Sequence, residues 1–63
     1  MKKVKPGYCV RYKNRSAVLD GQLGIVVETF QTEIPGEYSI VAIGVLGRFY
    51  LYRNEYDVVA ECD

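Results

Sequence analysis

Apolar and polar side chains alternate along residues 8–12. Tyr8, Val10 and Tyr12 fall on one side of an extended chain, and the two residues between them fall on the other. A period of two is typical of a β-strand that buries one face. This segment is therefore predicted to be the first strand of the protein, with its three alternating residues toward the core.

The same alternation returns in residues 48–52, closer to the C-terminus. Phe49 and Leu51 are predicted to point inward. The outward side is predicted to carry Arg48, Tyr50 and Tyr52. The dipeptide Leu46-Gly47, which comes directly before this segment, is short enough to close a β-hairpin. The segment is therefore expected to pair with the strand that precedes it.

Three further segments are predicted as strands. Residues 24–30 are rich in β-branched side chains, which suit a pleated and half-buried surface. Residues 38–45 are apolar at nearly every position, so part of this strand is predicted to be covered on both faces. Residues 58–60 form a short apolar run, which is predicted as the last strand.

Polar and turn-forming residues separate these strands. Residues 13–21 are predominantly polar and end in the turn dipeptide Asp20-Gly21, so they are predicted as a loop. Ile34-Pro35-Gly36 favours a tight reversal after the second strand, because Pro suits the second turn position and Gly the third. The pattern allows at most one 3₁₀ turn, around residues 54–56, before the last strand.

These elements predict an all-β fold in a single domain that spans residues 1–63. A chain of this length buries about 60% of the surface that its unfolded form exposes, which leaves no room for a second core. Five short strands at this spacing are typical of a small barrel. Closure of the barrel is expected to bring the first and last strands together and to remove edges that could pair with other chains.

The composition leaves few side chains that could act in catalysis. The chain has no histidine, the side chain whose ordinary pKa lies nearest neutrality and the most frequent metal ligand. Its two cysteines, Cys9 and Cys62, are fewer than the four ligands of a structural zinc site. No carboxylate or thiol stands in a recognisable catalytic motif. We therefore predict a protein that is not an enzyme, with no catalytic residues, no metal site and no cofactor.

The cysteines also bear on the compartment. Residues 1–7 lack the apolar stretch of a secretory signal, so a cytoplasmic protein with reduced thiols is expected. If the first and last strands pair, Cys9 and Cys62 could instead form a disulfide, and this alternative stays open. Asn14-Arg15-Ser16 matches the glycosylation acceptor pattern and is interpreted as a chance match. No apolar run approaches the ~20 residues of a spanning helix, so no membrane insertion is expected.

Two parts of the chain carry a family resemblance. Pro6-Gly7-Tyr8-Cys9-Val10-Arg11-Tyr12 is followed by a polar loop and by Gly21-Gln22-Leu23-Gly24-Ile25-Val26-Val27, and the chain later runs through Leu51-Tyr52-Arg53-Asn54-Glu55-Tyr56-Asp57-Val58-Val59. This pattern of strands and glycines resembles the KOW-type and related bacterial SH3-like barrels. Members include KOW domains of ribosomal proteins and transcription factors, which bind RNA or proteins, and small subunits of photosynthetic electron-transfer complexes. The resemblance implies a small five-stranded SH3-like barrel that acts as a binding module.

The charges balance overall but divide along the chain. The first 15 residues carry six positive charges, whereas the remainder carries eight acids and two arginines. One interpretation is a basic patch on the first strand and the following loop, which would bind RNA or an acidic protein. The other is that closure of the barrel neutralises this strand with Glu55, Asp57, Glu61 and Asp63. We favour the second, because nucleic-acid modules usually carry a basic excess.

Six tyrosines are a large number for a chain of this length. Tyr50 and Tyr52 are predicted to lie on the same side as Arg48, an arrangement that could stack bases or anchor a protein interface. Tyrosine also serves as a structural residue, with its ring over the core and its hydroxyl in water. This structural use is expected of Tyr8, Tyr38 and Tyr56. The candidate binding residues are Arg11, Tyr12, Lys13, Arg15, Arg48, Tyr50 and Tyr52.

The leading hypothesis for function is a binding module that contacts another protein as an accessory or regulatory subunit, through the fourth strand and residues 13–21. A phage or mobile-element protein that occupies a host enzyme is one form of this hypothesis. The second hypothesis is an RNA or single-stranded nucleic-acid module, whose affinity would fall steeply with salt. A redox role for Cys9 or Cys62 is a weaker alternative. Recognition of proline-rich peptides is disfavoured, because the chain has no tryptophan to line a groove.

Overall fold

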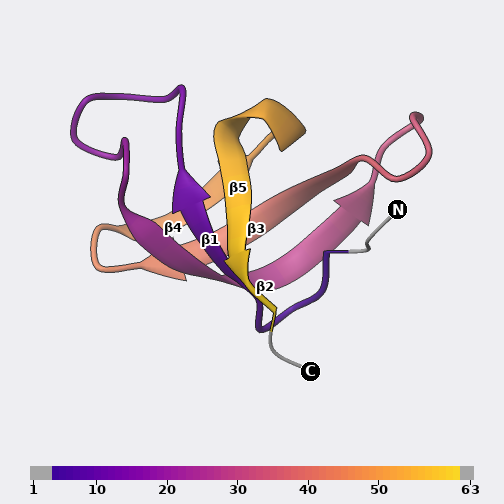
Figure 1. Ribbon diagram of the computed structural model, residues 1–63, viewed down its shortest axis with the longest axis horizontal. Helices are drawn as coiled ribbons and strands as arrows, with labels where there is room; N and C mark the ends of the chain where they lie inside the picture. Colours follow the sequence, from indigo (N-terminus) through magenta and orange to yellow (C-terminus); the bar gives the residue numbers. More distant parts are fainter. Residues whose placement is uncertain (1–3, 62–63) are drawn as a thin grey trace.

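The computed structural model describes residues 4–61 and contains one antiparallel sheet of five strands. The strands are β1 (Cys9–Tyr12), β2 (Leu23–Gln31), β3 (Tyr38–Gly44), β4 (Gly47–Leu51) and β5 (Tyr56–Ala60), and the short 3₁₀ helix η1 (Arg53–Glu55) precedes β5. Their order across the sheet is β4-β3-β2-β1-β5. The sheet is strongly twisted, and the long β1–β2 loop projects from one end (Figure 1). The predicted all-β fold is confirmed.

Each predicted strand is present, with small shifts at its ends. β5 begins at Tyr56, two residues earlier than predicted, because this residue pairs with Tyr12 of β1 and lies fully in the core. The predicted 3₁₀ turn is confirmed as η1, one residue earlier in the chain. β3 ends at Gly44, so Val45 lies in the β3–β4 turn and is exposed.

The closed barrel is not confirmed. β1 does pair with β5, as predicted, through Val10 opposite Val58 and Tyr12 opposite Tyr56. Among the described residues, however, β4 and β5 do not pair, and they form the two edges of the sheet. The chain passes between these two strands through η1 instead of a hairpin. One sheet that is open between β4 and β5 is therefore the observed architecture.

The core lies on the inner face of this sheet. Its buried apolar residues come from all five strands and from two loops, and they are Tyr8, Val10, Tyr12, Leu19, Val26, Ile40, Ala42, Leu51 and Tyr56. Phe49 packs against this cluster, and its ring meets that of Tyr12 edge-on at 6.0 Å between centroids. The inward positions predicted for β1 and β4 are therefore confirmed. The tyrosine hydroxyl of Tyr56 donates to the backbone carbonyl of Tyr38 at 2.8 Å.

An irregularity in β2 changes which side chains face outward. The pairing with β3 shifts between Val26 and Glu28, so Val27 is an extra residue opposite β3. Such a bulge bends a strand and reverses the facing of everything beyond it. Figure 1 shows β2 bending near its middle. Val26 therefore faces the core, whereas Glu28 and Phe30 lie on the outer face.

The β1–β2 loop is anchored by a residue that the polar composition of the segment did not indicate. Leu19 is buried in the core, although it lies within residues 13–21. The backbone N–H of Leu19 donates to the Ser16 carbonyl at 3.1 Å, and that of Asp20 donates to the same carbonyl at 2.8 Å. Gly21 has a φ of 85°, a conformation that favours glycine, and its N–H donates to the Tyr12 carbonyl. The loop therefore folds back on β1.

The predicted reversal between β2 and β3 is also confirmed. The N–H of Glu37 donates to the carbonyl of Ile34 at 3.1 Å, which closes a tight turn. Gly36 stands at the third position of this turn with a φ of 80°. Proline fits the second position, as expected for a type II turn.

Candidate functional site

Three aromatic side chains gather on the outer face of the sheet. Phe30 of β2, Tyr50 of β4 and Tyr52, which follows β4, are exposed by 42%, 45% and 61%. The rings of Tyr50 and Tyr52 meet edge-on at 5.5 Å, and those of Phe30 and Tyr50 are tilted at 5.8 Å between centroids. We call these three residues the aromatic cluster. Rings that touch one another and remain open to solvent form a rigid apolar surface of the kind found at protein interfaces.

The strand register explains how the aromatic cluster forms. Phe30 lies opposite Ser39 of β3, and Tyr50 lies opposite Val41 of the same strand. Residues two apart on one strand share a face, so these side chains fall on one surface that spans β2, β3 and β4. Ser39 is buried although it belongs to this outer face. The prediction that part of β3 is covered on both faces is therefore confirmed at Ser39, which is buried on the outer side.

The apolar surface continues along the sheet away from the cluster. Ile25 of β2 lies opposite Ile43 of β3, and both are exposed. Val41 lies between this pair and the aromatic cluster on the same face of β3. Single exposed apolar residues are ordinary, whereas large contiguous groups of them are characteristic of interaction surfaces.

Arg48 borders this surface. It is exposed on β4 and lies opposite Ile43, two residues from Tyr50 on the same face. On the other side of β3, Glu28 lies opposite Val41. Over β2, β3 and β4 the outer face therefore has an apolar centre with one positive and one negative side chain beside it, which resembles the polar rim of a protein interface.

Arg15 links the β1–β2 loop to β4. Its Nη1 donates to the backbone carbonyl of Tyr50 at 3.0 Å and lies 3.6 Å from Oε1 of Glu55. The Glu55 carboxylate also accepts the N–H of Tyr52 at 2.9 Å. The guanidinium of Arg15 is thus held between the edge of β4 and η1, and it supports the backbone that carries two members of the aromatic cluster.

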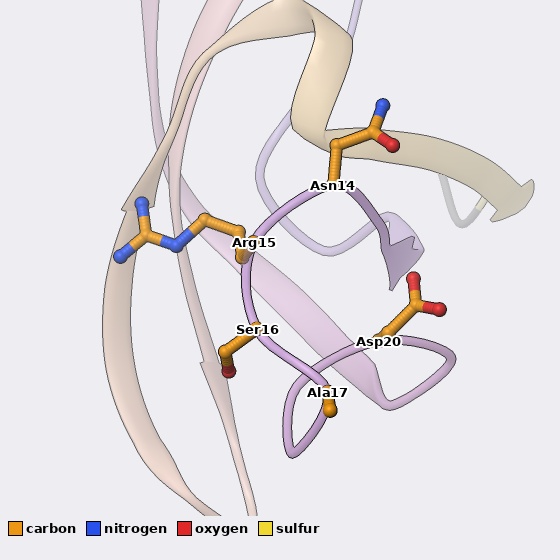
Figure 2. A pocket seen from close by; sticks show the side chains of 5 residues that line it. All are labelled: Asn14, Arg15, Ser16, Ala17 and Asp20. Atoms are coloured by element: carbon orange, nitrogen blue, oxygen red, sulfur yellow. The ribbon is translucent and has the colours of Figure 1, made fainter.

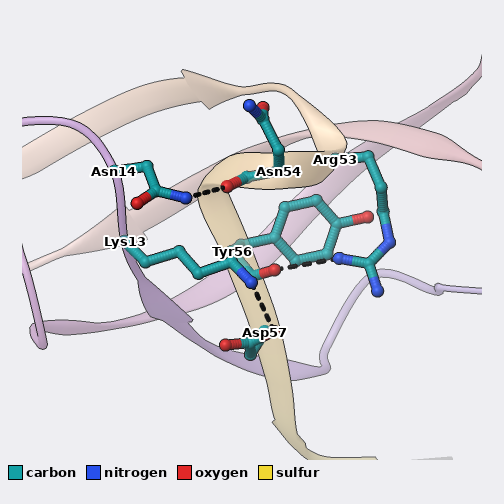
Figure 3. A network of polar contacts seen from close by, with 6 residues as sticks. All are labelled: Lys13, Asn14, Arg53, Asn54, Tyr56 and Asp57. Atoms are coloured by element: carbon teal, nitrogen blue, oxygen red, sulfur yellow. Dashed lines mark hydrogen bonds and ion pairs between the residues drawn. The ribbon is translucent and has the colours of Figure 1, made fainter.

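A second set of polar contacts ties the same loop to η1 and β5 (Figure 3). Nζ of Lys13 forms an ion pair with Asp57 at 3.0 Å. Nδ2 of Asn14 donates to the backbone carbonyl of Asn54 at 2.9 Å. The N–H of Lys13 donates to the carbonyl of Glu55 at 3.0 Å. These contacts hold the loop against η1 and the start of β5.

The predicted neutralisation of the basic segment is confirmed where the structure describes it. Asp57 lies opposite Arg11 in the β1–β5 register and pairs with Lys13, and Glu55 pairs with Arg15. Of the other residues named in the charge analysis, Lys2, Lys3 and Asp63 lie outside the described residues, as does Cys62. The loop therefore does not present a row of unopposed cations.

The predicted binding residues do not all lie on one surface. Arg48, Tyr50 and Tyr52 share the outer face, as predicted. Arg11 is exposed on β1, whereas Lys13 and Arg15 are engaged by acids at the gap between β4 and β5. Tyr12 needs a correction: it is 1% exposed and belongs to the core, because its position in β1 faces inward with Val10. It cannot contact a partner.

Phe30 is the member of the aromatic cluster that sequence reasoning missed. A strict period of two places residue 30 on the same side as Val26, which is the buried side. The bulge at Val27 reverses this facing. The β-branched run that surrounds the bulge gives no local signal of its position, so only the pairing with β3 reveals it.

Two shallow hollows lie near the loops, and neither is a developed ligand pocket. One, of about 240 Å³, is lined by residues of the β1–β2 loop from Asn14 to Asp20 (Figure 2). The other, of about 330 Å³, lies between the β2–β3 turn and Arg53. The guanidinium of Arg53 is already used, since its Nη1 donates to the Tyr56 carbonyl at 2.9 Å and its Cζ lies 5.0 Å from the centre of that ring. Small-molecule pockets are usually deeper and enclose most of the surface of their ligand.

The pKa values of two buried tyrosines, Tyr12 and Tyr56, are raised. Burial raises the pKa of Tyr12, and the nearby Cys9 adds to this effect. Burial also raises the pKa of Tyr56, while the charge of Arg53 opposes the rise and Glu37 adds to it. Both hydroxyls are therefore held neutral inside the fold and are not placed as catalytic acids or bases.

Within residues 4–61, no group of three or more His, Cys, Asp or Glu side chains is arranged to hold a metal ion. No described helix is long and apolar enough to cross a membrane. No family model matches the chain, and neither a curated protein nor a solved structure does.

Proposed function

We propose that this protein is a non-enzymatic binding module that docks on another protein through the outer face of β2, β3 and β4. The observation that carries the proposal is the aromatic cluster, three exposed rings that contact one another on a rigid sheet. Aromatic residues dominate the binding energy of protein interfaces because they bury a large area with little loss of conformational freedom. The partner surface would be apolar at its centre, with polar groups that meet Arg48 and Glu28.

The charge distribution supports a protein partner over a nucleic acid. Lys13 and Arg15, the cations expected to bind phosphate, are paired with Asp57 and Glu55. The formal net charge is zero. Binding to a phosphate backbone depends on unopposed cations and on the counterions that they release.

A second candidate function rests on one arrangement. Arg48, Tyr50 and Tyr52 stand on the same face, where two rings could stack on unpaired bases beside a guanidinium. This site would bind a short single-stranded segment of RNA or DNA. It predicts strong weakening by salt, which the apolar protein interface does not.

The proposed role is that of an accessory or regulatory subunit, and occupation of a host enzyme by a phage or mobile-element protein is one form of it. The pairing of β1 with β5 and the 3₁₀ turn before β5 support the further proposal of an SH3-like barrel related to KOW domains. In such a module the loops and sheet faces contact partners while the core only supports them.

Affinity capture from the source cells tests the proposal. The wild-type chain and three variants are compared: Phe30→Ser and Tyr52→Ser in the cluster, and Val45→Ser as the control. Val45 is 96% exposed at the β3–β4 turn, so its replacement removes an exposed apolar side chain outside the cluster. We expect both cluster variants to lose the captured protein and the control to retain it, with no effect of nuclease treatment.

Two results would contradict a protein partner. One is capture that both cluster variants leave unchanged. The other is capture of nuclease-sensitive material whose binding falls about tenfold or more between low and physiological salt, as phosphate contacts require. The second result would favour the nucleic-acid module.

A further inference from the structure

β4 has one edge that no strand covers. Within the described residues it pairs with β3 alone. The carbonyl of Tyr50 points away from β3, since it accepts a hydrogen bond from the Arg15 side chain. Backbone groups of alternate residues point to the same side of a strand, so those of Arg48 also face this edge. The edge therefore offers backbone donors and acceptors to another strand.

The sequence of β4 lacks the usual protections of an edge strand, and among the described residues the one side chain bonded to its open edge is Arg15 of the β1–β2 loop, at the Tyr50 carbonyl. In natural edge strands, proline, lysine or charges that point inward prevent pairing with another chain. β4, with the sequence Gly-Arg-Phe-Tyr-Leu, has none of these, and Arg48 is its one charge and points outward. Both edges carry one carbonyl that accepts from an arginine, Tyr50 in β4 and Tyr56 in β5, but β5 also carries Asp57, which is paired with Lys13.

We propose that β4 pairs antiparallel with β4 of a second copy of this chain, about a two-fold axis at Phe49. The outer-face side chains of the strand then oppose complementary residues of the second copy. Arg48 lies beside Tyr50 of the second copy, a cation against an aromatic ring, and this contact occurs twice. The pairing joins two five-stranded sheets into one.

The turn before β4 and the residue after it meet through side chains alone, because the N–H and the carbonyl of Tyr52 are bonded to Glu55 within the chain. Leu46 falls opposite Tyr52 of the second copy, and both side chains are exposed in the single chain. No like charges meet across the strand pair, and the net charge of zero adds no repulsion between copies. The Tyr50 carbonyl has two lone pairs, so it can accept from the second copy while Arg15 remains bound.

Sedimentation equilibrium of the purified full chain, up to about 1 mM, tests this proposal. We expect a monomer–dimer equilibrium, which is weak because an edge pairing buries little surface. The register is tested by two variants at one position. Tyr50→Arg places arginine opposite Arg48 of the second copy, whereas Tyr50→Glu places a carboxylate there. We expect the dissociation constant of the arginine variant to exceed that of the glutamate variant by about tenfold or more.

Circular dichroism of both variants checks that the half-exposed site tolerates each residue. A wild-type chain that stays monomeric at about 1 mM overturns the proposal, and so do equal dissociation constants for the two variants. The result is independent of the proposed docking function. Phe30→Ser removes a ring that contacts Tyr50 but changes no backbone group of the β4 edge, so it should abolish partner capture while the dissociation constant of the dimer changes by less than about threefold.

Discussion

The hydroxyl group of Tyr12 fills the space in which a side chain at position 24 would stand. A Cβ on Gly24 would also lie 2.7 Å from Cζ of the same ring. Gly44, which pairs with Gly24 across β2 and β3, likewise leaves room, since a Cβ there would lie 3.2 Å from the hydroxyl oxygen. Two glycines on neighbouring strands therefore leave the space that the ring of Tyr12 occupies.

Gly24→Ala should destabilise the protein by about 1–3 kcal/mol, the usual cost of overpacking a core. The added methyl group collides with the buried ring of Tyr12, whose Cζ would lie 2.7 Å away. In the background of Tyr12→Phe the cost should fall, since the atom closest to the new methyl group is gone. Urea unfolding followed by far-ultraviolet circular dichroism measures both effects. Equal costs in the two backgrounds would show that the clash lies elsewhere.

The hydroxyls of the two core tyrosines should respond differently to removal. The Tyr12 hydroxyl is buried without a hydrogen-bond partner among the described residues, whereas the Tyr56 hydroxyl donates to the Tyr38 carbonyl at 2.8 Å. Tyr12→Phe should therefore leave the free energy of unfolding unchanged or raise it, because no bond is lost. Tyr56→Phe should lower it by about 1 kcal/mol. The same urea titration compares the pair, and a larger loss for Tyr12→Phe would contradict the packing.

Alkaline pH should unfold the protein through these two residues. Burial raises the pKa of Tyr12 and of Tyr56, so the folded chain keeps phenolic protons that the unfolded chain releases near pH 10. Their contribution to stability is complete below about pH 10 and is lost as the pH rises through the raised values. Urea midpoints between about pH 8 and 11 should fall at the alkaline end. Tyr56→Phe should flatten that fall, and an unchanged slope would exclude this cause.

Arg15 should contribute more to stability than Lys13. The Lys13–Asp57 pair is solvent-exposed on both sides, so Lys13→Ala should cost less than about 0.5 kcal/mol. Arg15→Ala removes a bond to the Tyr50 carbonyl and a charge beside Glu55, whose side chain is only 14% exposed. Its cost should be about 1 kcal/mol or more. Thermal unfolding of the two variants measures the difference, and equal melting temperatures would contradict it.

Part of the candidate site was predictable because it depends on local alternation. The outward facing of Arg48, Tyr50 and Tyr52 follows from the period of two in a strand that contains no bulge. The same alternation placed Tyr12 among the inward-facing residues of β1. The prediction that Tyr12 binds a partner was therefore inconsistent with the predicted burial of its side chain. Phe30 could not be assigned to the outer face, since its facing depends on the bulge at Val27.

The pairing of charges was predictable in kind but not in detail. Strand β5 was expected beside β1, and this alone brings Asp57 to the basic segment. The capture of Arg15 by Glu55 and by the Tyr50 carbonyl depends on where the loop lies, which Leu19 decides by entering the core. A single buried leucine in a polar segment carries no periodic signal.

The order of residues by itself determined that the chain forms short strands, where they lie and which side of β1 and β4 is buried, because side-chain alternation is a property of neighbours in the chain. Only the tertiary structure decided that Phe30 joins two tyrosines on the outer face, that Glu55 and the Tyr50 carbonyl hold Arg15, and that β4 does not pair with β5. Each of these depends on register and on contacts between residues far apart in the chain, for which no local pattern exists.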